Sequence, residues 1–468
     1  MRVYLLGIAG TGMGSFAGLL RKAGHEVSGS DENVYPPMSD KLAEWKIRTF
    51  TPYSADNLKR ADIDLAVVGN VIRADNVEAK AVRRLGIPHM SFPEALEELF
   101  LQKRHPVVIV GTHGKTTTTA LCAQVLMHAG RDPSLLVGGV PLNFNEGFRL
   151  GGGEHFVLEG DEYDTAYFDK GPKFLHYRPR TAIFTGAEFD HADIYRDTPH
   201  YESAFEKFFA LLPQDGYVAA CSAFPNWKRL ASFAKCKVES YCVRDDAEAN
   251  WHARWVNLGP AGAAFEVDYK GQPEIRVTLP AAGRHNVENA LGVYAACRAL
   301  GLKPDEISAG FRTFRGVKRR QELRGEVNGV AVIDDFAHHP TAVRETIAAV
   351  LAQYPGRRLV AVFEPRSNTA MRKIHQDEYA HAFRGAEEAI ISQPTAIAKV
   401  PESERIDAKK MAADIAAAGT RARWFESPDA IVAALAKETR AGDVVLAMSN
   451  GAFGGLHDKL LKVLGART

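Results

Sequence analysis

The sequence contains few cysteines, and their spacing does not suggest a covalent framework. There are five among 468 residues, without any C-x-x-C pair. An odd number of cysteines in mostly apolar surroundings is typical of reduced, structural thiols. We therefore exclude a disulfide-stapled secreted domain and expect no catalytic cysteine. The cysteines are Cys122, Cys221, Cys236, Cys242 and Cys297.

The sequence also lacks an excess of charge and long apolar runs. Its 58 Lys and Arg residues against 57 Asp and Glu residues leave a formal charge of +1. Without a strong overall field, we expect no nucleic-acid or membrane partner, and any anionic substrate must be held by local groups. No apolar run approaches the length of a membrane span, and the first residues do not have the pattern of a signal peptide. We expect a cytoplasmic protein.

Apolar, strand-like runs alternate with helical segments along the whole chain. At this length two to four domains are expected. We predict an α/β protein of three domains in series, separated near the segments 91–106 and 314–317. The domains are an N-terminal Rossmann-like domain at 1–105, a central P-loop domain with a parallel sheet at 106–315, and a C-terminal Rossmann-like domain at 316–468.

The most informative stretch is a glycine-rich turn in the central unit. It follows the apolar run 107–110 and leads into a helical segment at 120–126. Backbone N–H groups in such a turn, together with the helix N-terminus, bind phosphate oxygens. Lys115 would reach the terminal phosphates and the Thr116 hydroxyl would ligate Mg²⁺, so we predict ATP binding. The loop, which is shorter than the usual motif, comprises Gly111, Thr112, His113, Gly114, Lys115, Thr116 and Thr117.

A second glycine-rich turn lies in the first unit, after the apolar run 3–6. It is followed by a helix and by a strand that ends at Ser30 and Asp31, as in a dinucleotide-binding unit. Another strand at 65–68 ends at Gly69 and Asn70. The pattern taken alone fits a nicotinamide dinucleotide or any other nucleotide diphosphate, because a lone glycine fingerprint is weak evidence.

Two acidic segments follow apolar strands of the central unit. A carboxylate in the segment 159–164 suits Mg²⁺, although a solvated acidic loop fits the sequence equally well. The apolar run before Glu159 favours the functional interpretation. In the segment 188–193, acids flank His191 and would orient its ring, but imidazole is not a typical Mg²⁺ ligand.

Two further motifs stand where helices begin. In the segment 283–290, we expect His285 or Asn286 as an N-cap, and Asn289 has an amide able to recognise adenine. In the segment 334–340, Pro340 marks a helix start, and the dense Asp and His residues favour a function beyond capping. Arg319 and Arg320, just upstream, would neutralise a phosphoryl group in transfer.

The order and content of these motifs resemble the Mur ligases, the ATP-dependent amino-acid and peptide ligases of peptidoglycan metabolism. The resemblance covers essentially the whole chain. Its motifs are Gly-Thr-x-Gly-Lys-Thr-Thr at 111–117, Glu-x-Asp-Glu at 159–162, Asp-His-x-Asp at 190–193, His-Asn-x-x-Asn at 285–289 and Asp-Asp-x-x-His-His-Pro at 334–340.

The resemblance implies a role for each motif. The first glycine turn would hold the diphosphate of a UDP-sugar through Gly10, Thr11, Gly12 and Met13, with Asp31 and Asn70 near the uridine. Metal ligands would be Thr116, Glu159 and His191. Asn289 would recognise adenine, Arg320 would meet ATP phosphate, and Asp335 would close over the nucleotide.

Two segments point to one branch of the family. The segments 29–39 and 364–369 resemble members that join UDP-N-acetylmuramate to a recycled tripeptide, L-alanyl-γ-D-glutamyl-meso-diaminopimelate, with 143–144, 168–170 and 449–455 in agreement. Arg366, Ser367 and Asn368 would then face the peptide, whose carboxylate suits an arginine fork. The alternatives are the branch that adds L-alanine to the same sugar nucleotide, a nicotinamide oxidoreductase and a non-catalytic nucleotide switch. Monomer and dimer both remain open.

The implied mechanism passes through an acyl phosphate. Lys115, Arg320 and Mg²⁺ would stabilise the transferring phosphoryl group, and His338 or a nearby carboxylate would accept the amine proton. Two positions depart from the family pattern. Gly186 replaces an asparagine, and Phe205 stands where many members carry a carbamoylated lysine, with Lys207 nearby, so we predict no such modification.

Overall fold

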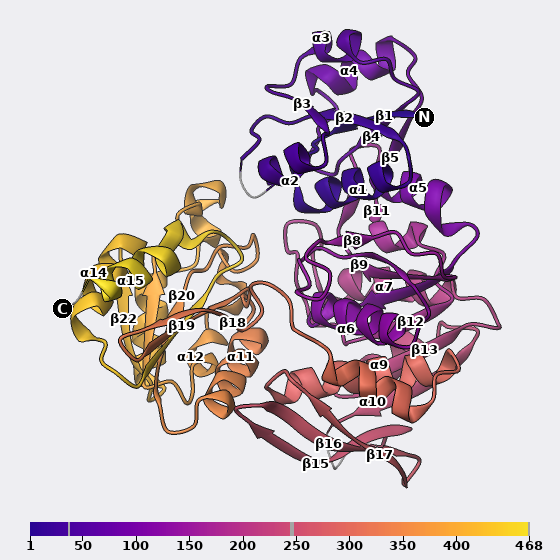
Figure 1. Ribbon diagram of the computed structural model, residues 1–468. Helices are drawn as coiled ribbons and strands as arrows, with labels where there is room; N and C mark the ends of the chain where they lie inside the picture. Colours follow the sequence, from indigo (N-terminus) through magenta and orange to yellow (C-terminus); the bar gives the residue numbers. More distant parts are fainter. Residues whose placement is uncertain (36–37, 244–247, 467–468) are drawn as a thin grey trace.

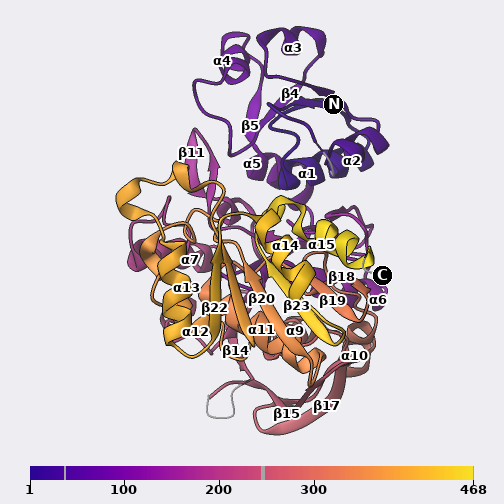
Figure 2. The ribbon, with the colours of Figure 1, turned by 90° about the vertical axis from the view of Figure 1, so that its left-hand side faces the viewer.

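The computed structural model describes residues 1–35, 38–243 and 248–466, and it arranges them around three main sheets (Figure 1). The chain forms the sheets one after another, as the sequence predicts for three α/β units. The N-terminal unit and the C-terminal unit both lie against the central one (Figures 1 and 2). The predicted boundary after residue 105 falls one residue inside β6, which begins at His105, and the one after residue 315 falls between α10 and β18.

The N-terminal sheet is parallel and has the strand order β3-β2-β1-β4-β5. The order reverses between β1 and β4, and ligands of such sheets bind outside the strand ends at this reversal. The glycine turn 7–10 and Asn70 lie there. The elements are β1 Arg2–Leu6, α1 Thr11–Lys22, β2 Glu26–Ser30, α2 Met38–Glu44, β3 Arg48–Phe50, α3 Ala55–Arg60, β4 Leu65–Val68, α4 Val77–Arg84, β5 His89–Ser91 and α5 Phe92–Leu96, with a π-turn η1 at Glu97–Leu101.

The central sheet has ten strands in the order β17-β16-β15-β14-β13-β12-β6-β9-β7-β8. The neighbouring strands from β15 to β7 in this order run parallel, β8 pairs with β7 in the antiparallel direction, and β16 and β17 extend the other edge as antiparallel strands next to β15. The strands are β6 His105–Val110, β7 Ser134–Leu136, β8 Phe148–Arg149, β9 His155–Gly160, β12 Thr181–Phe184, β13 Tyr217–Cys221, β14 Lys237–Cys242, β15 Trp251–Gly259, β16 Gly262–Tyr269 and β17 Gln272–Leu279. The helices are α6 Lys115–His128, α7 Thr198–Ala210, α8 Trp227–Ala231, α9 Arg284–Ala299 and α10 Pro304–Arg312.

A small antiparallel pair, β10 Asp164–Ala166 and β11 Asp169–Pro172, stands apart from the central sheet and leads into the turn η2 Lys173–His176.

The prediction that His285 or Asn286 is the N-cap of α9 is wrong. The cap position is Gly283 at φ +101°, without a side-chain cap, because Asn286 lies inside the helix and donates to the Ala282 carbonyl.

The C-terminal sheet has the order β18-β19-β23-β20-β21-β22 and is parallel except for β18. The predicted helix start at Pro340 is confirmed. The elements are β18 Glu322–Val327, β19 Val330–Asp335, α11 Pro340–Gln353, β20 Arg358–Phe363, η3 Lys373–His375, α12 Tyr379–Ala382, β21 Glu388–Ser392, η4 Ile397–Lys399, η5 Glu402–Glu404, α13 Ala408–Ala417, β22 Arg421–Phe425, α14 Pro428–Glu438, β23 Asp443–Met448, η6 Phe453–Gly455 and α15 Leu456–Gly465.

The apolar cores show how the units are joined. One buried cluster runs from Phe16 and Leu19 in the N-terminal unit to Phe148 and Phe156 in the central unit. The C-terminal unit has separate clusters on the two faces of its own sheet. Its attachment to the central unit therefore rests on other contacts, which are described below. Within the described part of the chain, no helix combines the length and hydropathy required to cross a membrane.

Candidate active site

The phosphate-loop sequence forms a tight turn between β6 and α6. Gly111 and Gly114 have φ values of +134° and +77°, which only glycine adopts easily. The end of β12 holds the turn in place, because the Thr185 hydroxyl donates to the His113 carbonyl at 2.6 Å and the Thr112 N–H donates to the Gly186 carbonyl at 2.8 Å. Tight glycine turns of this kind at a helix N-terminus can bind phosphate through their N–H groups.

Lys115 lies in a buried ionic cluster at the start of α6. Its Nζ is 2.8 Å from Glu162 Oε2, and His191 Nε2 is 3.3 Å from Glu162 Oε1. Burial opposes each charge, but the pairing dominates: the pKa of Lys115 is raised, that of Glu162 is lowered to about 2 and that of His191 is raised to about 8. All three groups are therefore charged at neutral pH.

Thr116 and Glu159 place two hard oxygen ligands next to each other at the start of α6 and the end of β9. The Thr116 hydroxyl donates to Glu159 Oε1 at 2.8 Å, and the Gly138 N–H donates to Glu159 Oε2 at 2.8 Å. Burial and the neighbouring Asp161 raise the pKa of Glu159, so a divalent cation would stabilise its ionised form. These groups fit Mg²⁺. His191, the third predicted ligand, instead pairs with Glu162 in this structure.

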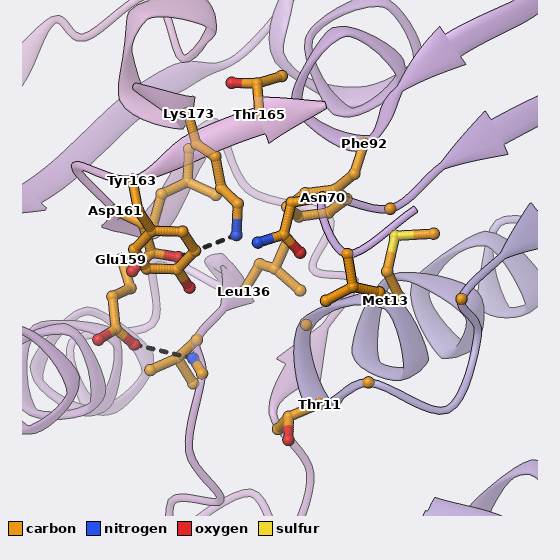
Figure 3. A pocket seen from close by; sticks show the side chains of 18 of the residues that line it. Thr11, Met13, Asn70, Phe92, Leu136, Glu159, Asp161, Tyr163, Thr165 and Lys173 are labelled. Carbon is orange, nitrogen blue, oxygen red and sulfur yellow. Dashed lines mark hydrogen bonds and ion pairs between the residues drawn. The ribbon is translucent and has the colours of Figure 1, made fainter. Parts of the chain in front are cut away.

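A cavity of about 270 Å³ lies between the N-terminal and central units (Figure 3). The predicted UDP-sugar residues Gly10, Thr11, Gly12, Met13 and Asn70 line one side. Glu159, Asp161, Tyr163 and Lys173 line the other. The cavity therefore connects the glycine turn to the proposed metal pair.

Asp31, the remaining residue predicted for the UDP-sugar, shapes the glycine turn. Its Oδ2 accepts the Ala9 N–H at 2.9 Å, and Tyr53 donates to Oδ1 at 3.3 Å. These bonds tie the end of β2 to the turn before α1. Its contact with uridine stays a prediction.

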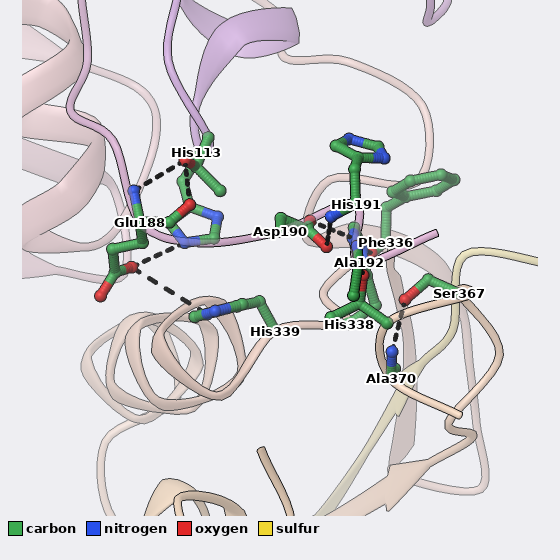
Figure 4. Close-up of polar contacts among 12 residues, drawn as sticks. His113, Glu188, Asp190, His191, Ala192, Phe336, His338, His339, Ser367 and Ala370 are labelled. Atoms are coloured by element: carbon green, nitrogen blue, oxygen red, sulfur yellow. Dashed lines mark hydrogen bonds and ion pairs between the residues drawn. The ribbon is translucent and has the colours of Figure 1, made fainter. Parts of the chain in front are cut away.

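The C-terminal unit contacts the loop 188–193 of the central unit through polar groups (Figure 4). The Thr341 hydroxyl donates to Glu188 Oε1 at 3.1 Å, and Asn368 donates to Asp193 Oδ2 at 2.9 Å. His338 Nε2 lies 3.7 Å from Asp190 Oδ2. Although burial opposes it, hydrogen bonding and the nearby imidazoles hold the pKa of Asp190 well below its usual range.

A His-Glu-His set stands at the same contact. The ligand atoms of His113, Glu188 and His339 all lie within 4.8 Å of one another, and two imidazoles would suit a transition metal better than Mg²⁺. Hydrogen bonds already account for the arrangement, because His113 Nε2 is 2.8 Å from Glu188 Oε2 and His339 Nδ1 accepts the Thr341 N–H at 3.3 Å. We interpret the set as part of the contact between units.

Two of the remaining predicted nucleotide residues, Arg320 and Asn289, lie beside the phosphate loop. Arg320 Nη2 is 3.4 Å from the Thr116 hydroxyl, and its guanidinium lies over the Phe336 ring. Asn289 is buried and lies against Gly114, where an added Cβ would meet its side chain. Asp335 accepts the Gln321 and Ala337 N–H groups, each at 2.8 Å, so it shapes the turn that carries Arg320.

The three predicted peptide residues follow β20. Arg366 is partly exposed, with Nη1 3.8 Å from the buried Glu364. The Ser367 hydroxyl accepts the Ala370 N–H at 3.0 Å, while Asn368 joins the central unit as described. Glu364 also accepts the Ser449 hydroxyl at 2.6 Å, so the segment 449–451 from the end of β23 lies beside this loop.

The two positions that depart from the family pattern are filled by aromatic packing. Phe205 is fully buried among Phe174, Phe184 and Tyr201, and Lys207 is exposed. At Gly186, with φ +109°, an added Cβ would collide with the Phe224 ring.

Sequence reasoning missed Glu162 as the partner of Lys115, and it missed Lys173 altogether. Glu162 stands within the predicted acidic motif, but its partner is 47 residues away in the sequence. Lys173 lies in a polar stretch without a distinguishing pattern.

The chain matches known family models in three segments, and each segment corresponds to one of the three units. The chain matches the Mur ligase family, catalytic domain, over residues 2–104, the Mur ligase middle domain over 109–297 and the Mur ligase, glutamate ligase domain, over 319–451. Together with full-length relatives, these matches show that the chain belongs to the Mur ligase family. It is therefore an enzyme of the ligase class.

Individual relatives indicate which kind of ligase the chain resembles. The chain is 39% identical to the UDP-N-acetylmuramate–L-alanyl-γ-D-glutamyl-meso-2,6-diaminoheptandioate ligase of Escherichia coli K12, over 100% of this chain and 99% of that one. It is 32% identical to the UDP-N-acetylmuramate–L-alanine ligase of Acetivibrio thermocellus, over 96% and 93%. A crystal structure of a murein peptide ligase from Psychrobacter arcticus 273-4 superimposes with a TM-score of 0.74 at 35% identity, over 100% and 99%.

Proposed function

We propose that this chain joins UDP-N-acetylmuramate to the tripeptide L-alanyl-γ-D-glutamyl-meso-diaminopimelate, with conversion of ATP to ADP and phosphate. The observation that carries the proposal is that the interdomain cavity and the phosphate loop meet at Glu159. This residue lines the interdomain cavity and also accepts the hydroxyl of Thr116 in the phosphate loop. A sugar acid in the cavity and a triphosphate on the loop would therefore be neighbours. The names and identities of the relatives support this substrate pair.

The chemistry follows from the positions of the side chains. The sugar carboxylate attacks the γ-phosphorus, ADP leaves, and the resulting acyl phosphate is attacked by the peptide amine with release of phosphate. Lys115 leaves Glu162 to meet the terminal phosphate, and Arg320 approaches it from the C-terminal side. Thr116 and Glu159 would hold Mg²⁺, which neutralises phosphate charge. His338 or a nearby carboxylate accepts the amine proton, and Asn289 and Asp335 complete the nucleotide site.

An acyl phosphate must be shielded from water, which would hydrolyse it. The contacts of the C-terminal unit with the central unit support closure of the site around this intermediate. Arg366, Ser367 and Asn368 present the acceptor peptide from this unit. Since ATP and nucleotide sugars are substrates, we place the reaction in the cytoplasm. The substrates are small molecules, and the proposal includes no nucleic-acid or membrane partner.

The test is a product assay with a panel of acceptors. The protein is incubated with UDP-N-acetylmuramate, ATP and Mg²⁺, together with L-alanine, the tripeptide, or the corresponding tetra- and pentapeptides, and the products are weighed by mass spectrometry. We expect a tripeptide adduct and equimolar ADP. The 32% identical relative makes alanine ligation the second candidate. An adduct with L-alanine alone would establish that candidate and contradict our proposal.

A further inference from the structure

One buried ammonium group in the interdomain cavity has no place in the mechanism so far. Among the described residues that line the cavity, Lys173 alone has a basic side chain, whereas Glu159 and Asp161 have acidic ones. Lys173 follows β11 at the first position of η2 and is only 7% exposed. Burial of a charged group is costly unless a partner compensates it.

The protein compensates this charge incompletely. Lys173 Nζ is 3.4 Å from Asp161 Oδ2, at the long end of hydrogen bonding, and 4.0 Å from the centre of the Tyr163 ring. An ammonium group has three N–H donors, and within the described residues Asp161 is its one hydrogen-bond acceptor. Figure 3 shows the Lys173 side chain extending into the cavity toward Asn70 of the N-terminal unit. Donors thus remain for a ligand in the cavity.

The ligand that we propose for the cavity has two kinds of negative charge. The diphosphate can be met by backbone N–H groups at the glycine turn and by the N-terminus of α1, as is usual for such turns. The sugar carboxylate must instead lie near Glu159, so that it can reach the γ-phosphate. This end of the cavity contains Asp161, whose carboxylate would repel that of the sugar if no cation lay between them.

Building on the proposed function, we propose that Lys173 binds the carboxylate of the sugar acid and directs it toward the terminal phosphate of ATP. The ammonium lies between Asp161 and the open part of the cavity, where it can bridge the protein carboxylate and the substrate carboxylate. Tyr163 supports it through its ring face. Lys173 would thus make the site select a sugar nucleotide with an acid group over one without.

The test compares two ligands that differ by this acid group. Binding of UDP-N-acetylmuramate and of UDP-N-acetylglucosamine, which lacks the lactyl carboxylate, is measured by titration calorimetry without ATP. We expect Lys173→Met to weaken UDP-N-acetylmuramate binding by about 10- to 100-fold, the range for a charged hydrogen bond, and to leave UDP-N-acetylglucosamine binding unchanged. Lys173→Arg should restore part of the selectivity.

Lys170→Met is the matched control. Lys170 lies on β11 only three residues away, is 66% exposed and pairs with Asp164, so this variant should bind both ligands normally. Equal losses of both ligands in Lys173→Met would assign Lys173 to the diphosphate or to folding and would overturn the inference, as would unchanged binding of both. If the unmodified protein itself bound no UDP-N-acetylmuramate, the proposed function would fail first.

Discussion

Lys115 is a buried cation whose carboxylate partner a phosphate group can replace. Its ammonium is held by Glu162 at 2.8 Å, and Glu162 is also paired with His191 and almost fully buried. The pair keeps Lys115 charged inside the protein, and a terminal phosphate can replace Glu162 as its partner.

Lys115→Ala should therefore abolish ATP turnover and amide formation together. We expect kcat to fall by at least about 100-fold, the usual effect of removing one group that stabilises the transition state. The measurement is phosphate release alongside adduct formation by mass spectrometry. Lys170→Ala, which removes an exposed lysine, serves as the control. Near-normal ligation by Lys115→Ala would refute the assignment of the phosphate loop.

At Gly186, the ring of Phe224 occupies the space that a larger side chain would need. Gly186→Asn should destabilise the protein, because φ is +109° and the new Cβ would collide with the ring. We expect a loss of about 1–3 kcal/mol in the free energy of unfolding, measured by denaturant titration. The second change Phe224→Ala should not add its full cost, since it removes the collision. Additive losses in the double variant would contradict this account.

At the scale of elements, the sequence predicts most of the framework but not its polar connections. Strands such as β6, β9, β12 and β23 are short apolar runs buried on both faces, and this pattern identifies them directly. The pair β10–β11 was missed because Asp169–Pro172 is polar and lacks an alternating pattern. The phosphate loop could be predicted from the local sequence alone, because an apolar strand, a glycine turn and a helix follow one another.

The partners within the site were less accessible to sequence reasoning. Lys115 and Glu162, or Glu188 and Thr341, are brought together only by the packing of distant elements. The roles predicted for Asn289, Arg320 and Asp335 came from a family resemblance. The structure places Asn289 and Arg320 beside the loop and Asp335 at the turn that carries Arg320, but their ligand contacts remain predictions.

The loop after β20 has the features of an acceptor site. Arg366 is partly exposed and is only weakly paired with Glu364, at 3.8 Å, so its guanidinium is available for a substrate carboxylate. Arg366→Ala should raise the KM for the tripeptide by about 10-fold or more and leave the KM for UDP-N-acetylmuramate unchanged. The measurement is initial rates with each substrate varied in turn.

Arg372→Ala provides a control from the same segment. Arg372 is engaged with Glu404 and with the Asn368 carbonyl, each at 2.9 Å, so its loss should affect stability more than the choice of acceptor. If Arg366→Ala raised both KM values equally, the loop would not be the acceptor site.

At the scale of the whole molecule, the two junctions between units differ in kind. The N-terminal and central units share one apolar cluster, and sliding them apart would expose it to water. The C-terminal unit has apolar clusters of its own and meets the central unit through hydrogen bonds such as those of Thr341 and Asn368, and through a close approach of Ala349 to Gly283. Such bonds contribute only about 1 kcal/mol each, so we expect the C-terminal unit to open and close while the other two move together.

Thr341→Val should therefore favour the open arrangement of the C-terminal unit without changing the fold of any of the three units. It removes the hydroxyl that donates to Glu188 across the junction at 3.1 Å, and a loss of about 1 kcal/mol changes the open-to-closed ratio about five-fold. Small-angle X-ray scattering should show a larger radius of gyration for the unliganded variant, and a non-hydrolysable ATP analogue should reduce it. Thr395→Val breaks a comparable Thr–Glu bond, to Glu364 at 3.3 Å, inside the C-terminal unit, and should leave the radius unchanged. An equal change in both variants, or none in Thr341→Val, would show that this hydrogen bond does not control closure.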